Sequence, residues 1–317
     1  MGDKIMTRNF NFTKYKYFGI ISTVLIILGF IFTFTVKGGF NLGIDFKAGI
    51  NQQIAISSSE VIERVSVLDT LSGIKGVQVQ RVGSDIENRF VVKVQDSGED
   101  NFQSAVASSI KTALDSNFGS SKVTILSTEF VGGSFSSNLT QEVLFLTFFA
   151  LLLILAYVWI RFHLNYAFSA IVAIFHDVLF LLAFIGVTGL EVSTGTIAAV
   201  LTIIGYSLND TIVIFDRVRE NVKESSGSFE EKVNTSLNES LSRTIITSLT
   251  TLIAVTSIFI LADGQIKDFA LSLIVGIVIG TYSSIFVASS VVVTWGNKIA
   301  SNRHAKFETS SKLSVDK

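Results

Sequence analysis

The chain has 317 residues, a formal net charge of −1 and a hydrophobic fraction of 49%, a profile typical of a membrane protein and without a global field that would attract nucleic acid. Cysteine is absent, which excludes disulfides, thiolate metal sites and a cysteine nucleophile. The three histidines are scattered and no Walker-type phosphate loop is present, so neither a metal, a cofactor nor an enzymatic activity is expected.

The N-terminus predicts a first membrane span. Residues 1–16 are short and basic, and residues 18–36 form a continuous apolar run. About nineteen apolar residues are close to the length that crosses the hydrocarbon of a bilayer, whereas a signal peptide has a shorter apolar core and a cleavage site. We therefore expect an uncleaved transmembrane helix at residues 17–36, with a cytoplasmic N-terminus by the positive-inside rule.

About a hundred polar residues, 37–139, come next. Their apolar periodicity changes several times, which predicts short strands and two helices. The expected elements are a strand at 51–57, a helix at 58–71, strands at 77–82 and 89–94, a helix at 100–118 and a strand at 122–130. The order β-α-β-β-α-β predicts a ferredoxin-like α+β domain on the extracytoplasmic side, between the first and second spans.

Five further apolar runs complete a six-helix membrane protein, with a transmembrane region over residues 140–299. The runs lie at 143–160, 166–187, 193–215, 245–262 and 269–295. Basic residues gather at the N-terminus, near Arg161, in segment 216–243 and in the tail. This segment is therefore expected to be a cytoplasmic loop, and both termini are expected in the cytoplasm. The polar tail, 300–317, is expected to be cytoplasmic and disordered.

The last run carries a small residue at every fourth position. The positions are Ser272, Gly276, Gly280, Ser284 and Ala288. A stripe of small residues lets a second helix approach closely, so it predicts a packing face. The sequence leaves open whether the partner helix belongs to the same chain.

Two polar residues, Asn209 and Asp210, interrupt the run 193–215. Asp210 is about 7 Å from the end of the run at Phe215, at the rise of an α-helix. A carboxylate at this depth costs several kcal/mol unless it is paired, hydrated or protonated. One alternative is a structural aspartate bonded to a neighbouring helix. The other is a group that takes up and releases protons, because burial favours the uncharged carboxyl.

Arg243 begins the fifth run on the same side of the membrane and is a candidate counter-ion of Asp210. The alternative is that its side chain extends to lipid head groups. Thr244, Thr247, Ser248 and Thr251 follow at i, i+3, i+4, i+7 spacing. One face of this helix is therefore suited to line a hydrated path.

His176 and Asp177 lie near the middle of the third run. Adjacent helical residues do not face one another, so each is expected to need its own partner. The candidates are Asp210, Asn209 and the threonine stripe. A functional role and a satisfied pair in the helix core remain equally open.

Several segments, in this order, resemble the SecF family. They are NLGIDF after the first run, AIVAIFHDV in the third, GYSLNDTIVIFDRVREN in the fourth, SRTIITSLTT opening the fifth and GTYSSIFVAS in the sixth. The resemblance extends over residues 18–295. The chain departs from the usual G-x-D-F-x-G-G pattern at Ala48, and Ser290 stands where the family often has proline.

The resemblance implies a six-helix half of the resistance–nodulation–division (RND) type that pairs with SecD in the cytoplasmic (inner) membrane. It also implies work with the SecYEG channel, moving preproteins by the proton-motive force. The family's proton pathway includes the ND aspartate and the arginine opening the fifth helix, here Asp210 and Arg243. Asn209, His176, Asp177 and Thr247 are further candidates. The alternatives are a small-molecule exporter half of the same superfamily and a structural assembly factor.

Overall fold

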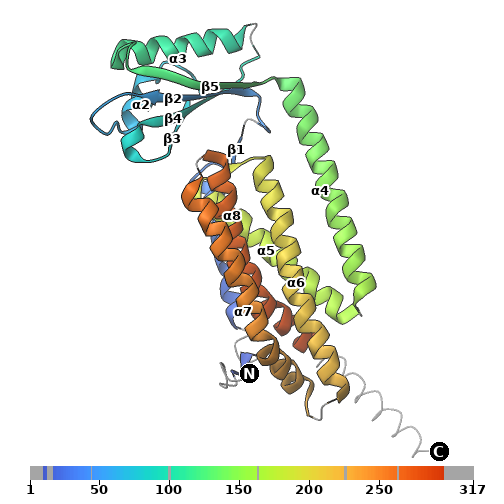
Figure 1. Cartoon of the computed structure of the whole chain (residues 1–317). Coiled ribbons are helices and arrows are strands. Elements are labelled where there is room, and N and C mark those ends of the chain that lie inside the picture. The colour runs from blue at the N-terminus through green and yellow to red at the C-terminus, as the bar shows by residue number, and fades with distance from the viewer. Residues whose placement is uncertain are drawn as a thin grey trace, which may run out of the picture.

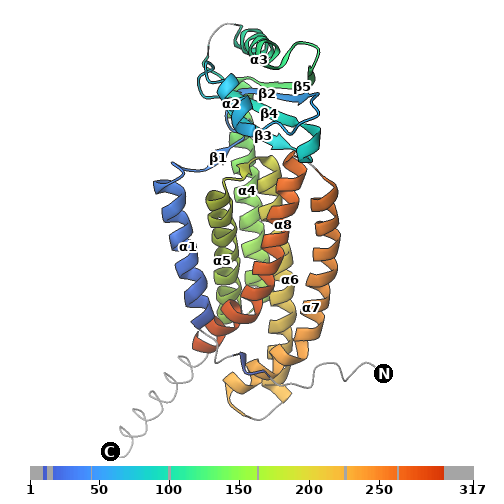
Figure 2. The same ribbon diagram turned by 90° about the vertical axis from the view of Figure 1, so that its left-hand side faces the viewer.

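The computed structural model describes residues 10–12, 17–43, 45–98, 101–162, 164–224, 227–262 and 264–295. Most of the expected N-terminal segment (1–16) and all of the expected tail (300–317) lie outside these residues. An α/β domain stands at one end of a bundle of long helices (Figures 1 and 2). Within the described residues, six helices are long and apolar enough to cross a membrane.

The α/β domain has the expected ferredoxin-like topology. Its strands are β2 (Gly49–Ile56), β3 (Gln78–Val82), β4 (Arg89–Gln95) and β5 (Val123–Val131). They form an antiparallel sheet in the order β3-β4-β2-β5. Helices α2 (Arg64–Thr70) and α3 (Phe102–Phe118) pack on it. The buried core includes Ile50, Ile54, Phe90, Ile110 and Leu114, which come from both the strands and α3.

The first helix of this domain begins later than expected, at Arg64 rather than at residue 58. Asn88 is the reason. Its side-chain Oδ1 accepts from the Ile62 amide at 2.8 Å, and its Nδ2 donates to the Glu60 carbonyl at 2.9 Å. These bonds engage the backbone of the preceding segment, and Glu63 is still extended, at φ −68° and ψ 142°.

The membrane helices are α1 (Tyr17–Thr35), α4 (Gly133–Arg161), α5 (Leu164–Thr188), α6 (Thr194–Glu224), α7 (Phe229–Leu261) and α8 (Gly264–Ser283). The last helix continues through a π-helical turn, Ser284–Ala288, to Trp295. Helices α5, α6 and α8 form the centre of the bundle, while α4 stands apart from it (Figure 1). Helix α4 also begins ten residues before its apolar run, inside the segment expected to belong to the α/β domain.

Segment 216–243, expected to be a loop, is mostly helical. Helix α6 continues to Glu224, and α7 begins after Ser228, whose side chain forms a capping box with Glu231. Val218 and Val233 are fully buried between the two helices' extensions. The charges that suggested a loop lie on the exposed face, where Arg217 bonds Glu239 and Glu220. The segment is therefore an amphipathic helical hairpin.

The small-residue stripe of α8 lies against α6 of the same chain. A Cβ added at Gly276 would overlap the Ile203 side chain, and one at Gly280 would lie 3.0 Å from the Ser207 Cβ. Ser284 donates to the Gly280 carbonyl at 2.8 Å and to the Ser207 carbonyl at 3.3 Å. The two helix backbones approach this closely because the stripe has no large side chain.

The connection after α1 joins the domain to the bundle. Its strand β1 (Asn41–Leu42) pairs in parallel with β6 (Glu191–Val192), in the turn between α5 and α6. The Asp45 carboxylate accepts from the Thr194 amide at 2.8 Å and from its hydroxyl at 2.9 Å, and so caps the start of α6. Ala48 is not among the residues with positive φ, so this position does not require the glycine usual in the family.

Candidate functional site

Asp210 lies on α6 at the edge of a polar cavity inside the membrane region. The cavity has a volume of about 230 Å³ and lies between α6, α7 and α8. Its polar lining consists of Asp210, Tyr206, Ser207, Asn209, Thr247, Ser248, Thr250, Thr251 and Thr281. A water molecule occupies about 30 Å³ in the liquid, so the cavity has room for several waters. Asp210 is buried, with only 9% of its surface exposed. Because it borders the cavity, water can still reach its carboxyl.

The partners of Asp210 come from the next helix in sequence. Ser248 of α7 lines the cavity beside Asp210 and is placed to donate to its carboxyl, and Arg243 acts on it as the nearby cation. The Ser248 and Thr281 hydroxyls are 2.7 Å apart and connect α7 to α8. Arg243 itself is exposed. The charge of Arg243 thus acts on Asp210, but the two side chains form no ion pair among those found in the described residues.

The threonine stripe of α7 faces the cavity in part. Thr247 and Thr251 line it, and their hydroxyls donate to backbone carbonyls one turn earlier, at 3.0 and 2.9 Å. Thr244 is buried away from the cavity, and its hydroxyl has no partner among the described residues. The part of the threonine stripe that lines the cavity therefore begins at Thr247 rather than at Thr244.

His176 and Asp177 each have a partner of their own, as expected, but contrary to expectation the two side chains also contact each other. His176 Nδ1 and Asp177 Oδ1 are 3.1 Å apart. The other Asp177 oxygen accepts from Ser207 at 2.5 Å and from Ser283 at 2.7 Å. His176 Nε2 is 2.8 Å from the Ser22 hydroxyl. The network joins α1, α5, α6 and α8, and it does not include Asp210, Asn209 or the threonine stripe.

Ser207 connects this network to the cavity. Its hydroxyl donates to Asp177, and the same residue lines the cavity beside Asp210. Sequence reasoning did not single out Ser22, Ser207 or Ser283 as partners of the histidine and aspartate. Serine is ordinary in membrane helices, so only the helix crossings distinguish these three.

A second charged cluster lies where the α/β domain meets the bundle. Lys93 of β4 forms an ion pair with Glu191 of β6, and the two side chains are 14% and 2% exposed. Burial lowers the pKa of Lys93, and the nearby carboxylates of Asp268 and Asp45 oppose this shift. Among the described residues, no group of three or more His, Asp or Glu is arranged to hold a metal ion.

Comparison with known proteins gives a family match. Residues 109–298 match the family of the protein export membrane protein SecD/SecF, C-terminal region. The protein translocase subunit SecF of Borreliella burgdorferi is 41% identical over 300 residues, which are 93% of this chain and 100% of that protein. The SecF subunit of Thermodesulfovibrio yellowstonii is 38% identical over 91% of this chain and 95% of its own length.

Solved structures agree with this match. The crystal structure of SecDF from Thermus thermophilus, a translocon-associated membrane protein, superimposes with a TM-score of 0.79 at 34% identity. It covers 92% of this chain, which spans 39% of that longer chain. A crystal structure of SecDF in a super-membrane-facing form superimposes with a TM-score of 0.63 at 31% identity. The match covers 95% of this chain and 40% of that SecDF chain.

Proposed function

The chain belongs to the SecD/SecF family of protein export membrane proteins, and from this premise we propose that it assists preprotein translocation by proton-coupled conformational change. It is a multi-pass membrane protein of the SecF type. In this proposal it pairs with SecD and acts on preproteins that pass through the SecYEG channel. The observation that carries the proposal is a buried carboxyl, Asp210, at a polar cavity of the membrane region.

Proton uptake at Asp210 changes its two interactions at once. The charged carboxylate attracts Arg243 and accepts from Ser248, both on α7. Protonation removes the charge, weakens both interactions and lets α6 and α7 repack. The work comes from the gradient, because one elementary charge that crosses 100 mV yields about 2.3 kcal/mol.

A route from this site to the α/β domain runs along α6. Asp210 is about 24 Å from the first residue of the helix, Thr194, at the rise of an α-helix. Asp45 holds that end, and the Lys93–Glu191 pair lies beside it. A shift or rotation of α6 is therefore transmitted to the domain.

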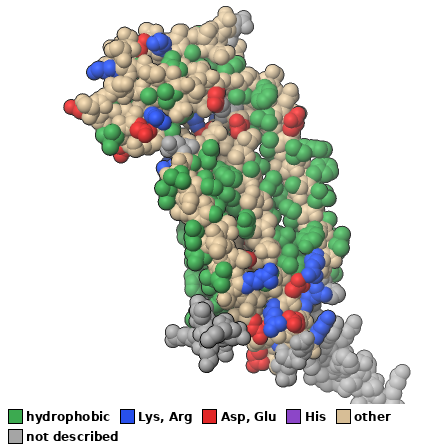
Figure 3. Space-filling view, in the orientation of Figure 1, with side chains coloured by type: hydrophobic (Ala, Val, Ile, Leu, Met, Phe, Trp, Pro, Cys, Tyr) green, Lys and Arg blue, Asp and Glu red, His purple; other side chains and the backbone are tan. Residues whose placement is uncertain are grey.

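The distribution of basic residues supports an orientation. Arg161, Arg217, Arg219, Lys223 and Lys232 lie at the end of the bundle away from the α/β domain, where charged side chains gather in Figure 3. By the positive-inside rule this end faces the cytoplasm. The α/β domain then lies on the extracytoplasmic side, and both termini lie in the cytoplasm. The membrane is the cytoplasmic (inner) membrane.

The Asp210→Asn variant tests the proposal. We expect it to assemble with SecD and to lose the whole benefit that a proton gradient gives to preprotein translocation, because asparagine cannot take up the proton. The measurement compares completed translocation in proteoliposomes that contain SecYEG and SecD, with and without a gradient. The matched control is Asp216→Asn, an exposed aspartate of the same helix that pairs with Arg161 and Arg219.

Two results would contradict the proposal. If the gradient's benefit persists in the assembled Asp210→Asn complex, the carboxyl is structural. If the variant fails to assemble while Asp216→Asn succeeds, the buried charge specifies helix packing, as a structural assembly factor requires. A small-molecule exporter would instead show gradient-driven efflux without SecYEG, and the same vesicles loaded with a dye measure this.

A further inference from the structure

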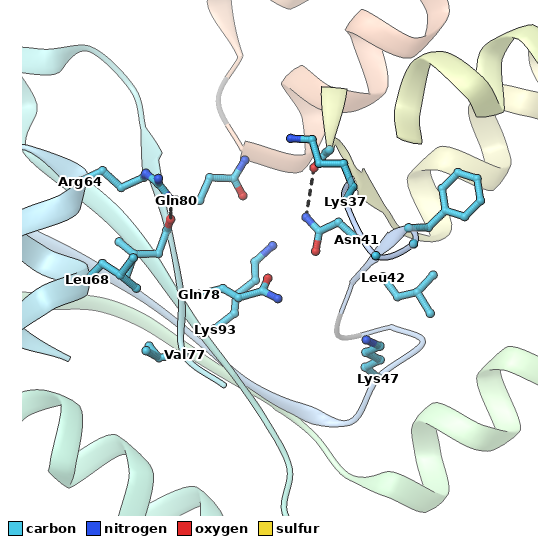
Figure 4. A pocket seen from close by; sticks show the side chains of 15 residues that line it. Lys37, Asn41, Leu42, Lys47, Arg64, Leu68, Val77, Gln78, Gln80 and Lys93 are labelled. Atoms are coloured by element: carbon cyan, nitrogen blue, oxygen red, sulfur yellow. Dashed lines mark hydrogen bonds between the residues drawn. The ribbon is translucent and has the colours of Figure 1, made fainter. Parts of the chain in front are cut away.

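A large cavity separates the α/β domain from the connection that follows α1. Its volume is about 640 Å³. One wall is formed by strand β3 with Gln78 and Gln80, and by Arg64 at the start of α2. The other wall is formed by residues 37–42 together with Gly189. Figure 4 shows Lys37, Gln80 and Lys93 projecting from these walls toward the space between them.

The charged side chains that line the cavity are all cationic. They are Lys37, Lys47, Arg64 and Lys93, and no acidic residue is among the lining residues. Lys93 is paired with Glu191. The other three are exposed, and none forms an ion pair with a residue that the structure describes. Together with the amides of the two glutamines, they offer donors to an anion. The Asn41 amide already donates to the Gly189 carbonyl at 3.2 Å, and Arg64 Nη1 donates to the Val79 carbonyl at 3.3 Å, which leaves the other guanidinium nitrogens of Arg64.

The cavity lies at the level where the apolar helices end. Lys37 follows the last residue of α1 by two positions, and Gly189 follows the last residue of α5 directly. The boundary of the hydrocarbon is therefore at the floor of the cavity, and the cationic groups are at the depth of the phospholipid head groups. Phosphodiesters are the most abundant anions at that depth.

The cavity also has an apolar side that is continuous with α1. Phe40 lines it and packs against Phe30 and Phe34 of α1, with ring centroids 6.3 and 5.8 Å apart. Leu42, also in the lining, is 39% exposed. Most of α1 below it is apolar and exposed, with only 17% of its span buried. A ligand with an anionic end and a long apolar end fits this arrangement better than a small soluble anion.

We propose that this cavity binds the head group of an anionic phospholipid from the leaflet next to the α/β domain, with its acyl chains along α1. The Arg64 guanidinium pairs with phosphate oxygens in a planar, two-point geometry, and the lysines act as point charges. A zwitterionic lipid carries its own cation, which the three unpaired cationic side chains repel. The site therefore selects phosphatidylglycerol over phosphatidylcholine.

The test uses the full chain purified in detergent, with phosphatidylglycerol and phosphatidylcholine as probes and native mass spectrometry as the readout. The variant is Lys37→Gln with Arg64→Gln. The matched control is Lys111→Gln with Lys122→Gln, two exposed cations of the same domain that do not line the cavity. We expect the first variant to bind phosphatidylglycerol roughly thirtyfold more weakly, since each basic residue near a membrane surface contributes about 1 kcal/mol.

The control should bind phosphatidylglycerol as the wild type does, and a Lys37→Arg variant should keep the affinity. Equal wild-type binding of the two lipids would overturn the proposal, as would equal losses in the variant and its control. Inorganic phosphate that displaces the lipid completely at equal concentration would also overturn it, because the site would then be a simple anion site. Thermal unfolding of each variant in the same detergent shows that the comparison concerns folded protein.

Discussion

The Lys93→Met variant is expected to lose about 3–5 kcal/mol of the free energy that holds the α/β domain on the membrane helices, because it leaves a buried carboxylate without its cation. The Glu191 side chain is 2% exposed, and its second oxygen already has no hydrogen-bond partner among the described residues. The measurement is hydrogen exchange in β1 and β6, because Glu191 lies in this pair of strands. We expect exchange there to accelerate by about two hundredfold to several thousandfold, since each 1.4 kcal/mol is about tenfold.

Two further variants test whether the unpaired Glu191 carboxylate causes the faster exchange in Lys93→Met. Lys111→Met removes an exposed cation that pairs with Asp115 on α3, and it should change exchange little, since surface ion pairs contribute about 0–1 kcal/mol. The double variant Lys93→Met with Glu191→Leu replaces both charges by apolar groups. If the instability of Lys93→Met comes from the unpaired Glu191 carboxylate, the double variant should recover most of the lost free energy. A double variant as labile as Lys93→Met alone would show that the lysine acts through other contacts.

The second large effect is expected at Asp177. The Asp177→Leu variant leaves the Ser207 and Ser283 hydroxyls and the His176 ring without their buried acceptor. Each unsatisfied buried group costs about 1–3 kcal/mol, so the loss of unfolding free energy should reach several kcal/mol. Asp177→Asn keeps an oxygen that accepts from both serines and should lose less than about half as much. Thermal unfolding in detergent compares the two variants.

The translocation activity of the Asp177→Asn variant shows whether the His176–Asp177 network is structural or belongs to the proton path. Asp177 does not line the cavity that contains Asp210, although Ser207 contacts both. We therefore expect folded Asp177→Asn protein to keep more of the gradient's benefit to translocation than Asp210→Asn does. Equal losses in the two variants would place the His176–Asp177 pair on the proton path itself.

The general architecture was predictable because its signals are local. Six apolar runs of spanning length and one β-α-β-β-α-β order are visible in the sequence, and the structure confirms both. The helical hairpin over 216–243 was not predicted, because its charges are visible in the sequence but the burial of Val218 against Val233 is not. The early start of α4 at Gly133 was missed for a related reason, since its first turns are polar.

The candidate site was predictable only in part. Asp210 could be found because a carboxylate within an apolar run is costly wherever the helix packs. The partners of His176 and Asp177 could not be found, because they depend on where four helices cross. The Lys93–Glu191 pair joins residues 98 positions apart, and neither residue is unusual in its local sequence. Long-range pairs of common residues carry no signal in a single sequence.

We expect a proton on Asp210 to move the α/β domain. Because the chain has no cysteine, spin labels at Ser109→Cys on α3 and Ser257→Cys on α7 report one distance by pulsed electron spin resonance. With cysteine-free SecD in nanodiscs, we expect the distance distribution to shift when the pH is lowered. In the Asp210→Asn variant the labels should show the low-pH distance distribution at every pH, because asparagine resembles the protonated carboxyl. A pH-dependent shift that persists unchanged in that background would contradict the claim.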